Sequence, residues 1–461
     1  MELFDNISPL DYRYYGRDSN IKSLLQPYLS ENARIRYQCR VEAALGRALA
    51  KKGLCSAKIA EEIGKACECV TAEEVYAGED QIKHDVRALA NAIRDKVGDE
   101  AKPFVHFGAT SYDIVDTANA LRYKEATEKA LVPELKALER TWIELALREK
   151  STLQIGRTHG QHAEPITFGF AISNYVSRLG SRIQQLESCK EKLVGKFSGA
   201  VGAYNSSSLF FEDPMDFEKT VLSELGLNAS ISSTQIAEPE PLTDFMHAVI
   251  STFGVLADFS DDMRHLQRSE IAEVGESFGK GQVGSSTMPH KRNPINFENV
   301  KSFYKAFMPR MISVYLDQLS EHQRDLTNSA SARFLPETLA ALYVSANRLD
   351  KASQKMVVDA DKMKRNFGQS QDLLLAEPVY LLLASHGHSN AHEASRAIAQ
   401  EAREKNVSFK RLLQEKEELK HYWNRLTPAQ QAVFENPANY TGIAAKKTEQ
   451  VCRIWKEKLQ L

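Results

Sequence analysis

The sequence predicts an all-α fold with a long central bundle of about five helices. Apolar residues recur at spacings of three and four, which is typical of one buried helix face in a bundle. No convincing run of alternating apolar and polar residues indicates a β-strand. The spacing is clearest along Ile172, Val176, Leu179, Ile183 and Leu186. The same spacing recurs one segment earlier and one segment later, in Leu135, Leu138, Trp142 and Leu145 and in Phe253, Leu256, Phe259, Met263 and Leu266.

Two more long helices are expected at about 295–323 and 336–364, because few glycines or prolines interrupt these stretches. Together with the helices of the three apolar seams they complete a five-helix bundle. We interpret the seams as protein core and not as cofactor-binding surfaces.

The composition divides the chain into three expected helical domains. Residues 1–111 are expected to form an N-terminal domain of shorter helices. Residues 112–364 are expected to hold the bundle and a glycine-rich loop at 275–294. Residues 365–461 form the third domain, and its charged run 415–418 is expected to be a solvated face. No low-complexity linker separates these regions, so they should pack as one body.

Length and charge limit the classes of function. A chain of 461 residues can bury a large core. Its 59 Lys and Arg and 61 Asp and Glu give a formal net charge of −2, so no global positive field attracts nucleic acid or an anionic membrane. An anionic substrate must therefore meet a local cluster of cations. The N-terminal residues lack the pattern of a secretory signal, and no stretch approaches about 18 consecutive apolar residues. We therefore expect a soluble, cytoplasmic protein.

The six cysteines are scattered over the chain. Cys67 and Cys69 are the one close pair, and neither a second pair nor a suitably spaced pair of histidines completes a zinc site. We expect reduced, mostly structural cysteines and no bound metal.

The run Gly284–Pro294 holds the densest set of reactive groups in the sequence. It contains two serines, a threonine, a histidine, two cations and an asparagine, and Gly275, Gly279 and Gly281 precede it. Such a glycine-rich loop can fold over a bound anion, direct donors to it and exclude water. The alternative is a polar surface loop without a function.

Three other segments combine groups suited to chemistry. The segment 156–165 is expected to be a loop entering a helix, with Pro165 near the first turn, where His159 is either a proton donor or a structural helix-entry residue. At 106–113, Ser111 or Asp113 could cap the next helix.

In the third segment, Arg324, Ser329 and Arg333 follow one another at spacings of five and four. Arginine forks with a hydroxyl suit a phosphate, although the arginines could instead form interface salt bridges.

The loop GSSTMPHKRNP and the segments GRTHGQHAEP and HFGATSYD together resemble the three motifs of the fumarase/aspartase superfamily. His290-Lys291-Arg292 resembles the adenylosuccinate lyase branch of that superfamily. The resemblance covers the whole chain and implies an all-α, three-domain, fumarase/aspartase-like fold and homotetramers whose active sites take residues from three subunits. It also implies β-elimination of fumarate from adenylosuccinate, giving AMP, and from SAICAR, giving AICAR, in purine biosynthesis with no metal or other cofactor.

The resemblance assigns catalytic roles to five residues. Ser285 matches the family's general base and His159 its general acid. Lys291 matches a residue that stabilises the aci-carboxylate intermediate. Glu298 matches a carboxylate that positions His159, and His84 matches a histidine that supports the acid. His162 we interpret as structural.

The resemblance also implies substrate contacts. Thr110 and Ser111 would hold substrate oxygens, and His106 would contact the nucleotide or its phosphate. Asn293 would bind the substrate carboxylate with Lys291. The remaining substrate-binding residues by this match are Arg13 and Tyr14, which would touch phosphate and base, Gln235, and the phosphate cluster Arg324, Ser329 and Arg333.

One segment departs from the family pattern. Residues 237–244 do not match the Arg-Asp-Arg-His stretch that often follows the glutamine at Gln235, although a shorter version of the branch has Glu-Pro there. The preferred nucleotide substrate therefore stays open. The alternatives are another fumarate-releasing lyase, such as an argininosuccinate lyase, or an inactive structural homologue.

Overall fold

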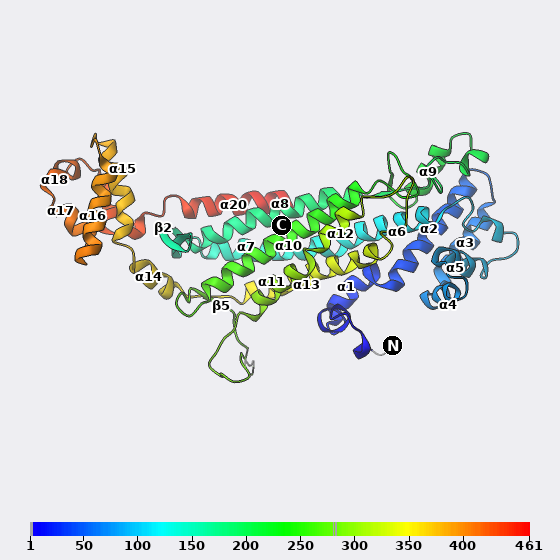
Figure 1. Ribbon diagram of the computed structural model, residues 1–461, viewed down its shortest axis with the longest axis horizontal. Coiled ribbons are helices and arrows are strands. Elements are labelled where there is room, and N and C mark those ends of the chain that lie inside the picture. The colour runs from blue at the N-terminus through cyan, green and yellow to red at the C-terminus, as the bar shows by residue number, and fades with distance from the viewer. Residues whose placement is uncertain (1–2, 280, 282–283) are drawn as a thin grey trace. The chain divides into compact units, whose positions relative to one another are not determined.

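A computed structural model describes residues 3–279, 281 and 284–461 (Figure 1). Most of these residues lie in helices, and the strands among them form three two-stranded pairs. The all-α fold class is therefore confirmed.

The chain forms two compact units. Unit 1 comprises Met1–Ala137, Ser181–Ala257 and Val300–Arg348, and unit 2 comprises Leu138–Gly180, Asp258–Asn299 and Leu349–Leu461. The predicted division into three domains, with boundaries after residues 111 and 364, stays a prediction. Five long helices contribute residues to both units: α7 (Val132–Arg148), α8 (Phe168–Glu191), α10 (Glu240–Leu266), α11 (Ile295–Phe307) and α13 (Leu335–Gln354).

In unit 2 the five long helices meet around two aromatic side chains. Trp142 of α7 stacks on Phe259 of α10, with ring centroids 4.2 Å apart, and its indole N–H donates to the Ser353 hydroxyl of α13 at 3.0 Å. Tyr175 of α8 contacts both rings, and Phe297 of α11 contacts Phe259. These buried aromatics carry much of the apolar area that stabilises a bundle core. The predicted apolar seams therefore do form the core of the five-helix bundle.

Among the residues that the structure describes, unit 1 also holds eight α-helices that lie within it alone. Helix α2 packs against α3 and α6. The Ser30 hydroxyl begins α2 by accepting a hydrogen bond from the Ala33 N–H at 3.1 Å, as expected of an N-cap serine. These helices are α1 (Ser19–Leu29), α2 (Glu31–Lys51), α3 (Ala57–Cys69), α4 (Ala72–Ile82), α5 (Asp85–Arg94), α6 (Ser111–Ala126), α9 (Pro214–Ser223) and α12 (Arg310–Leu316).

The strand pairs and single helical turns are short. The strand pairs are antiparallel β1 (Leu153–Thr158) with β2 (Gln161–Thr167), parallel β3 (Val194–Gly195) with β4 (Asn228–Ala229), and antiparallel β5 (Val274–Gly275) with β6 (Val357–Val358). Leu10–Tyr14 and Thr127–Leu131 are π-helical turns, and Leu3–Asp5, Lys102–Phe104, Ser207–Leu209, Ser331–Phe334, Leu373–Leu375 and Pro437–Asn439 are 3-10 turns.

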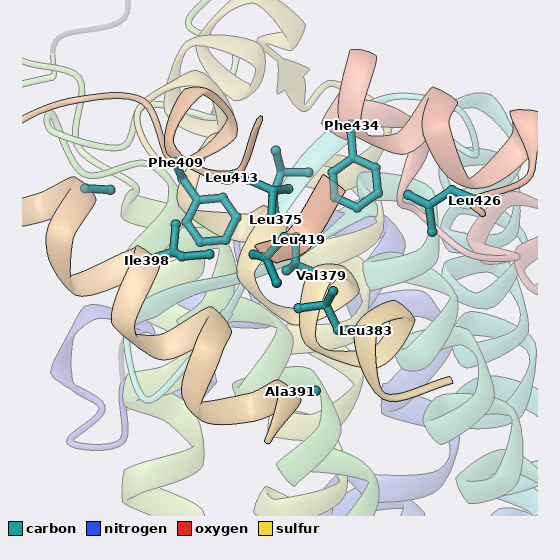
Figure 2. Packing of buried hydrophobic residues seen from close by; sticks show 11 residues of the cluster. Leu375, Val379, Leu383, Ala391, Ile398, Phe409, Leu413, Leu419, Leu426 and Phe434 are labelled. Carbon is teal, nitrogen blue, oxygen red and sulfur yellow. The ribbon is translucent and has the colours of Figure 1, made fainter. Parts of the chain in front are cut away.

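The C-terminal helices of unit 2 share an apolar core of their own. Figure 2 shows its side chains, among them Val379, Ile398, Phe409 and Phe434, converging from different helices. The acidic residues of the run 415–418 are exposed, as predicted. The core residues come from α15 (Ala376–Ser385), α16 (Ala391–Lys405), α17 (Phe409–Glu415), α18 (Glu417–Trp423), α19 (Pro428–Glu435) and the turns beside them. The other C-terminal helices of unit 2 are α14 (Ala360–Gly368) and α20 (Ala444–Leu459).

The expectation of a loop at 156–165 is wrong. This segment forms the hairpin β1–β2, whose turn residues His159 and Gly160 have φ of +53° and +73°. Two central residues with positive φ are typical of the tight type I′ turn, which matches the twist of paired strands. Pro165 therefore lies in β2, and helix α8 begins only at Phe168.

The two expected helices at 295–323 and 336–364 are shorter than predicted. Helix α11 ends at Phe307, and Pro309, which has no N–H to donate, stands between it and α12. Helix α13 ends at Gln354, because the chain then pairs through β6 with β5. Asp359 begins α14 by accepting a hydrogen bond from the Lys362 N–H at 2.9 Å.

Helix α10 is, within the described part of the chain, the one helix that is long and apolar enough to cross a membrane. However, 67% of its most apolar stretch is buried inside the protein. This is the burial expected of a core helix in a bundle.

The six cysteines have free thiols, as predicted. Four of them, Cys39, Cys67, Cys189 and Cys452, are buried and belong to the core.

Candidate active site

A cavity of about 580 Å³ lies in unit 1, a volume that suits a small-molecule ligand. Its walls come from the junction of α4 and α5, from α6, from the segment before α10 and from residues 324–335. Segments far apart in the sequence thus bring imidazole, guanidinium, hydroxyl and amide groups together. Six of the predicted site residues line the cavity: His84, Ser111, Gln235, Arg324, Ser329 and Arg333.

His84 begins helix α5 and is held by that helix. Its Nδ1 accepts a hydrogen bond from the Arg87 N–H at 3.2 Å. In a neutral imidazole whose Nδ1 accepts, the proton resides on Nε2. The preceding residue, Lys83, adopts a left-handed conformation (φ +59°) that turns the chain sharply from α4 into α5. The fold therefore presents Nε2 of His84 as a hydrogen-bond donor at the cavity wall.

The start of α6 rests on a buried ion pair. Thr110 is the N-cap residue, and its N–H donates to the Asp113 carboxylate at 2.9 Å, so that of the two predicted caps Asp113 takes part. Asp113 forms a fully buried salt bridge with Lys196, whose Nζ also donates to the Gly199 carbonyl at 3.1 Å. Ser111, the first residue of the helix, is left to line the cavity.

The segment that carries Gln235 is fixed through its backbone. The Gln235 N–H donates to the Gln323 carbonyl at 3.0 Å, and the Ala237 N–H donates to Asp116 Oδ2 at 3.0 Å. Neither contact involves the Gln235 side chain, which is therefore available to bind a ligand in the cavity. The start of the divergent segment 237–244 therefore lines the cavity before the chain enters α10.

The predicted phosphate cluster is only partly paired within the chain. Arg324 has a φ of +144° and donates from Nη1 to the Asp317 carbonyl at 3.2 Å. Among the described residues its buried Nε and Nη2 have no hydrogen-bond partner. The Arg333 side chain is 60% exposed and lies 3.8 Å from Asp85. Donors left unpaired in a cavity wall are suited to an anionic ligand.

Five other predicted substrate-binding residues are outside the lining of this cavity: Arg13, Tyr14, His106 and Thr110 of unit 1, and Asn293 of unit 2. The His106 Nδ1 instead lies 2.6 Å from the buried Glu42 carboxylate. Burial lowers the pKa of His106, but the Glu42 and Asp113 carboxylates raise it, and the net shift is upward. Tyr14 packs its ring against Phe303, with centroids 4.6 Å apart.

Other lining residues escaped prediction. Tyr112, Asp116 and Asn119 follow one another at spacings of four and three and form a polar face of α6 on the cavity. This spacing was the available signal. Burial raises the pKa of Asp116 to about 6, well above the usual value for an aspartate. Asp85 and Arg34 also line the cavity.

In unit 2, the hairpin β1–β2 exposes His159 at its tip. The neighbouring Arg157 is anchored by a buried salt bridge to Glu273, which its Nη1 reaches at 3.1 Å. Glu273 also accepts hydrogen bonds at 2.9 Å from the side chains of Gln154 in β1 and Asn366 in α14. One carboxylate directly before β5 therefore holds the base of the hairpin that carries His159.

The loop that carries Ser285 is closed at its base. The Glu276 carboxylate accepts from the Asn296 and Phe297 N–H groups at 2.8 and 3.0 Å and so caps the start of α11. Gly284 is required where the two legs approach, because a Cβ there would lie 2.0 Å from the Lys291 carbonyl oxygen. The Asn293 side chain donates to the Gly284 carbonyl at 2.8 Å. Part of the predicted loop, Lys280, Gln282 and Val283, lies outside the described residues.

Ser285 itself is half-buried in this loop. Its Oγ accepts from the backbone N–H groups of Thr287 at 3.3 Å and Met288 at 3.0 Å. Two such donors favour the deprotonated form of a hydroxyl. Lys291 and Glu298 are exposed, the latter in the first turn of α11.

His162 of β2 lies with its Nδ1 2.8 Å from the Ser370 hydroxyl. This contact joins the hairpin to the residues after α14 and suits the structural interpretation. Among the described residues, no three His, Cys, Asp or Glu side chains form a metal-sized group.

Known proteins resemble the chain along nearly all of its length. A family model described as "Lyase" matches residues 13–306, and one described as "Adenylosuccinate lyase C-terminal" matches residues 320–432. The adenylosuccinate lyase of Pyrococcus horikoshii is 34% identical over 457 residues, which are 98% of each chain. That of Bacillus subtilis is 35% identical over 354 residues, covering 76% of this chain and 80% of the relative.

Solved structures show the same fold. The 3-carboxy-cis,cis-muconate lactonizing enzyme from Pseudomonas putida has a TM-score of 0.82 at 24% identity and covers 95% of this chain and 98% of its own. A fumarate lyase from Mesorhizobium sp. BNC1 has a TM-score of 0.81 at 22% identity. The fold and the matched segments thus define a helical lyase. The chain belongs to the adenylosuccinate lyase family, whose members are carbon–nitrogen lyases.

Replacement of Glu273 by Gln should destabilise the protein and slow turnover. The change leaves Arg157 without its charged partner, and breaking a buried ion pair in this way costs about 3–5 kcal/mol of folding free energy. Hydrogen bonds that the new amide oxygen still accepts reduce this cost. Chemical denaturation should report the loss, and kcat should fall because the base of the His159 hairpin loosens. The double variant Arg157→Gln/Glu273→Gln should be less destabilised than the sum of the two single variants. Strict additivity would contradict this account.

Replacement of Asp116 by Asn should stabilise the protein in a pH-dependent way. Because the folded pKa of Asp116, about 6, lies above the ordinary value of about 3.8, protonation favours the folded state. The wild type therefore loses stability relative to the variant as pH rises from about 4 to about 6, and the difference is constant above that. We expect about 1–2 kcal/mol at pH 7, since the side chain is only half-buried. Urea titrations of both proteins from pH 4 to 8 measure it. A difference that does not change with pH contradicts the prediction.

Proposed function

We propose that this chain catalyses β-elimination of fumarate from adenylosuccinate, giving AMP, and from SAICAR, giving AICAR. It would act in purine biosynthesis in the cytoplasm, with no metal or other cofactor. The family and the activity named for its relatives support the reaction class. The nucleotide nature of the substrate is supported by one observation about the cavity.

That observation is the placement of Arg324, Ser329 and Arg333 in the same cavity as His84 and Ser111. The three residues offer guanidinium and hydroxyl donors, which bind phosphate through short charge-assisted hydrogen bonds. A substrate without phosphate, such as argininosuccinate, has no use for this cluster. The cavity therefore favours a nucleotide over the other substrates considered.

In this proposal the elimination proceeds by general acid–base catalysis. Ser285 removes the proton from the carbon next to the substrate carboxylate. Two backbone N–H groups that donate hydrogen bonds to its Oγ help by stabilising the deprotonated hydroxyl. His159, positioned by Glu298 and supported by His84, protonates the departing nitrogen. Lys291 and Asn293 stabilise the carbanion-like intermediate by binding its carboxylate.

The other substrate contacts are proposed from the family match. Thr110 and Ser111 hold substrate oxygens and Gln235 the nucleotide. Residues outside the cavity lining, Arg13, Tyr14 and His106, would reach a substrate from another subunit.

The proposed assembly is a homotetramer in which each active site takes residues from three subunits. Its support in the structure is exposed apolar surface on unit 1. Ile312 and Leu316 of α12 and the following Leu319 are 61%, 60% and 69% exposed. Apolar side chains clustered at such exposure mark an interaction surface.

The substrate is tested by an absorbance assay that offers adenylosuccinate, SAICAR and argininosuccinate separately and quantifies fumarate. The proposal expects turnover of the first two and none of the third. Turnover of argininosuccinate alone would identify the other lyase. Failure with all three, in a folded tetramer, would favour an inactive homologue.

Replacement of Ser285 by Ala should abolish most turnover while leaving fold and oligomer size unchanged. The hydroxyl is the proton acceptor in the proposed mechanism, and loss of a general base typically costs about 10²–10⁴-fold in rate. Steady-state kcat on adenylosuccinate measures the effect, with Ser286→Ala as the matched control in the neighbouring position. A Ser285→Ala enzyme with nearly wild-type kcat removes this residue from the mechanism.

Mixing two inactive variants tests the sharing of active sites. If His159 and Ser285 of one site come from different subunits, His159→Ala and Ser285→Ala proteins should regain activity when partly dissociated and reassembled together. Random mixing places both intact residues in about one quarter of the sites. Each variant taken alone through the same treatment is the control. Verified mixed tetramers without activity would show that one subunit supplies both residues.

A further inference from the structure

Arg34, in the first turns of α2, lines the cavity but belongs to none of the motifs that assign a function. Its Nε donates to Glu31 Oε2 at 2.7 Å, and its Nη2 donates to the Tyr76 hydroxyl at 3.0 Å. Tyr76 in turn donates to the same Glu31 oxygen at 2.6 Å. This closed triangle, on a side chain that is only 12% exposed, fixes the guanidinium in one orientation.

The fixed guanidinium faces Asp85, the residue after His84. Arg34 Nη1 lies 4.0 Å from Asp85 Oδ2, and Arg333 Nη2 lies 3.8 Å from that same oxygen. The other carboxylate oxygen, Oδ1, accepts from the Val86 N–H at 2.8 Å. Asp85 is therefore attracted by two arginines, but at these distances it is hydrogen-bonded to neither.

The two arginines differ in freedom. Arg333 is 60% exposed and can move, whereas Arg34 is held by Glu31 and Tyr76. Arg34 and Arg333 compete for the same oxygen of Asp85, so the loss of Arg34 would leave Arg333 as its nearest guanidinium among the described residues. Asp85 and Arg333 would then close into a bidentate pair, which occupies the fork that a phosphate needs.

We infer that Arg34 is a positioning residue of the anion site, which holds Asp85 away from Arg333 and so keeps the Arg333 fork available to a phosphate. This inference deepens the proposed function and rests on it for the identity of the natural ligand. The contacts of Arg34 with Glu31 and Tyr76 are what allow it to act, because a mobile arginine would follow Asp85 instead of restraining it.

The test measures the binding of inorganic phosphate by calorimetry in the full-length protein, which requires no turnover. Arg34→Gln should weaken phosphate binding about tenfold, the scale of losing one charge-assisted contact. Adding Asp85→Asn to the same protein should restore most of that loss, because the neutral amide that replaces the carboxylate cannot capture Arg333. Arg36→Gln removes the same charge from the same helix, at a position outside the cavity lining, and should leave phosphate binding unchanged.

A purely structural Arg34 would give a different pattern, in which Asp85→Asn strengthens phosphate binding by the same factor in the wild type and in Arg34→Gln, as the loss of one nearby negative charge does by itself. That result would overturn the inference, as would unchanged binding in Arg34→Gln or a wild type that binds no phosphate. If Arg34→Gln does not fold, Tyr76→Phe is the second variant, since it removes one of the two contacts of Arg34 at a partly exposed site. It should still weaken phosphate binding measurably. Unchanged phosphate binding in Tyr76→Phe would overturn the inference. Cleavage of adenylosuccinate by the wild type is measured separately. A failure of the proposed function is therefore distinguishable from a failure of the inference about Arg34.

Discussion

The buried carboxylate of Glu273 is the contact on which both proposed proton-transfer segments depend. It lies directly before β5, whose strand leads into the loop with Ser285, and it binds Arg157 two residues before His159. A buried ion pair contributes little net stability, because desolvation offsets its Coulomb energy. We therefore interpret the role of this ion pair as positioning the two segments. Gln154 and Asn366 complete the shell around the carboxylate, so the base of each segment is rigid while its tip stays exposed.

The chain distributes its functional groups in two sets. The side chains proposed to bind the substrate and its phosphate in the cavity belong to unit 1, whereas His159, Ser285, Lys291 and Glu298 belong to unit 2. The first set is built into helix starts and buried backbone contacts. The second set is carried by a hairpin turn and a glycine-rich loop, which are elements that can adjust when a substrate arrives. The proposed binding groups are thus held rigidly, whereas the segments that carry the proposed proton-transfer groups are anchored only at their base. This arrangement is consistent with the proposed elimination.

How much of this could be predicted follows from the range of the interactions. The bundle was predictable because helix periodicity is a local property. The burial of Trp142 or Ile172 is indicated by the apolar residues three and four positions away in the sequence. The cluster Arg324, Ser329 and Arg333 was predictable for the same reason, since it lies in one segment. The hairpin was missed because its strands are short and its turn, His159-Gly160, needs a positive φ that the residue types only hint at. The pairing of His106 with Glu42 and of Arg157 with Glu273 joins residues 64 and 116 positions apart, which no local pattern reports.

Acidic residues in or near a cavity proposed to bind an anion would repel that ligand, yet three of them have a defined structural task. Asp116 accepts the Ala237 N–H and fixes the segment of Gln235, Asp113 holds the start of α6, and Asp85 lies between two arginines. None of them occupies Nε or Nη2 of Arg324, which have no partner among the described residues. Leaving a buried donor unpaired costs about 1–3 kcal/mol, and more for a charged group. A phosphate that accepts from these donors removes that cost. An anion in the cavity would therefore stabilise the Arg324 guanidinium, and the proposed restraint of Asp85 by Arg34 would keep the Arg333 guanidinium available to the same anion.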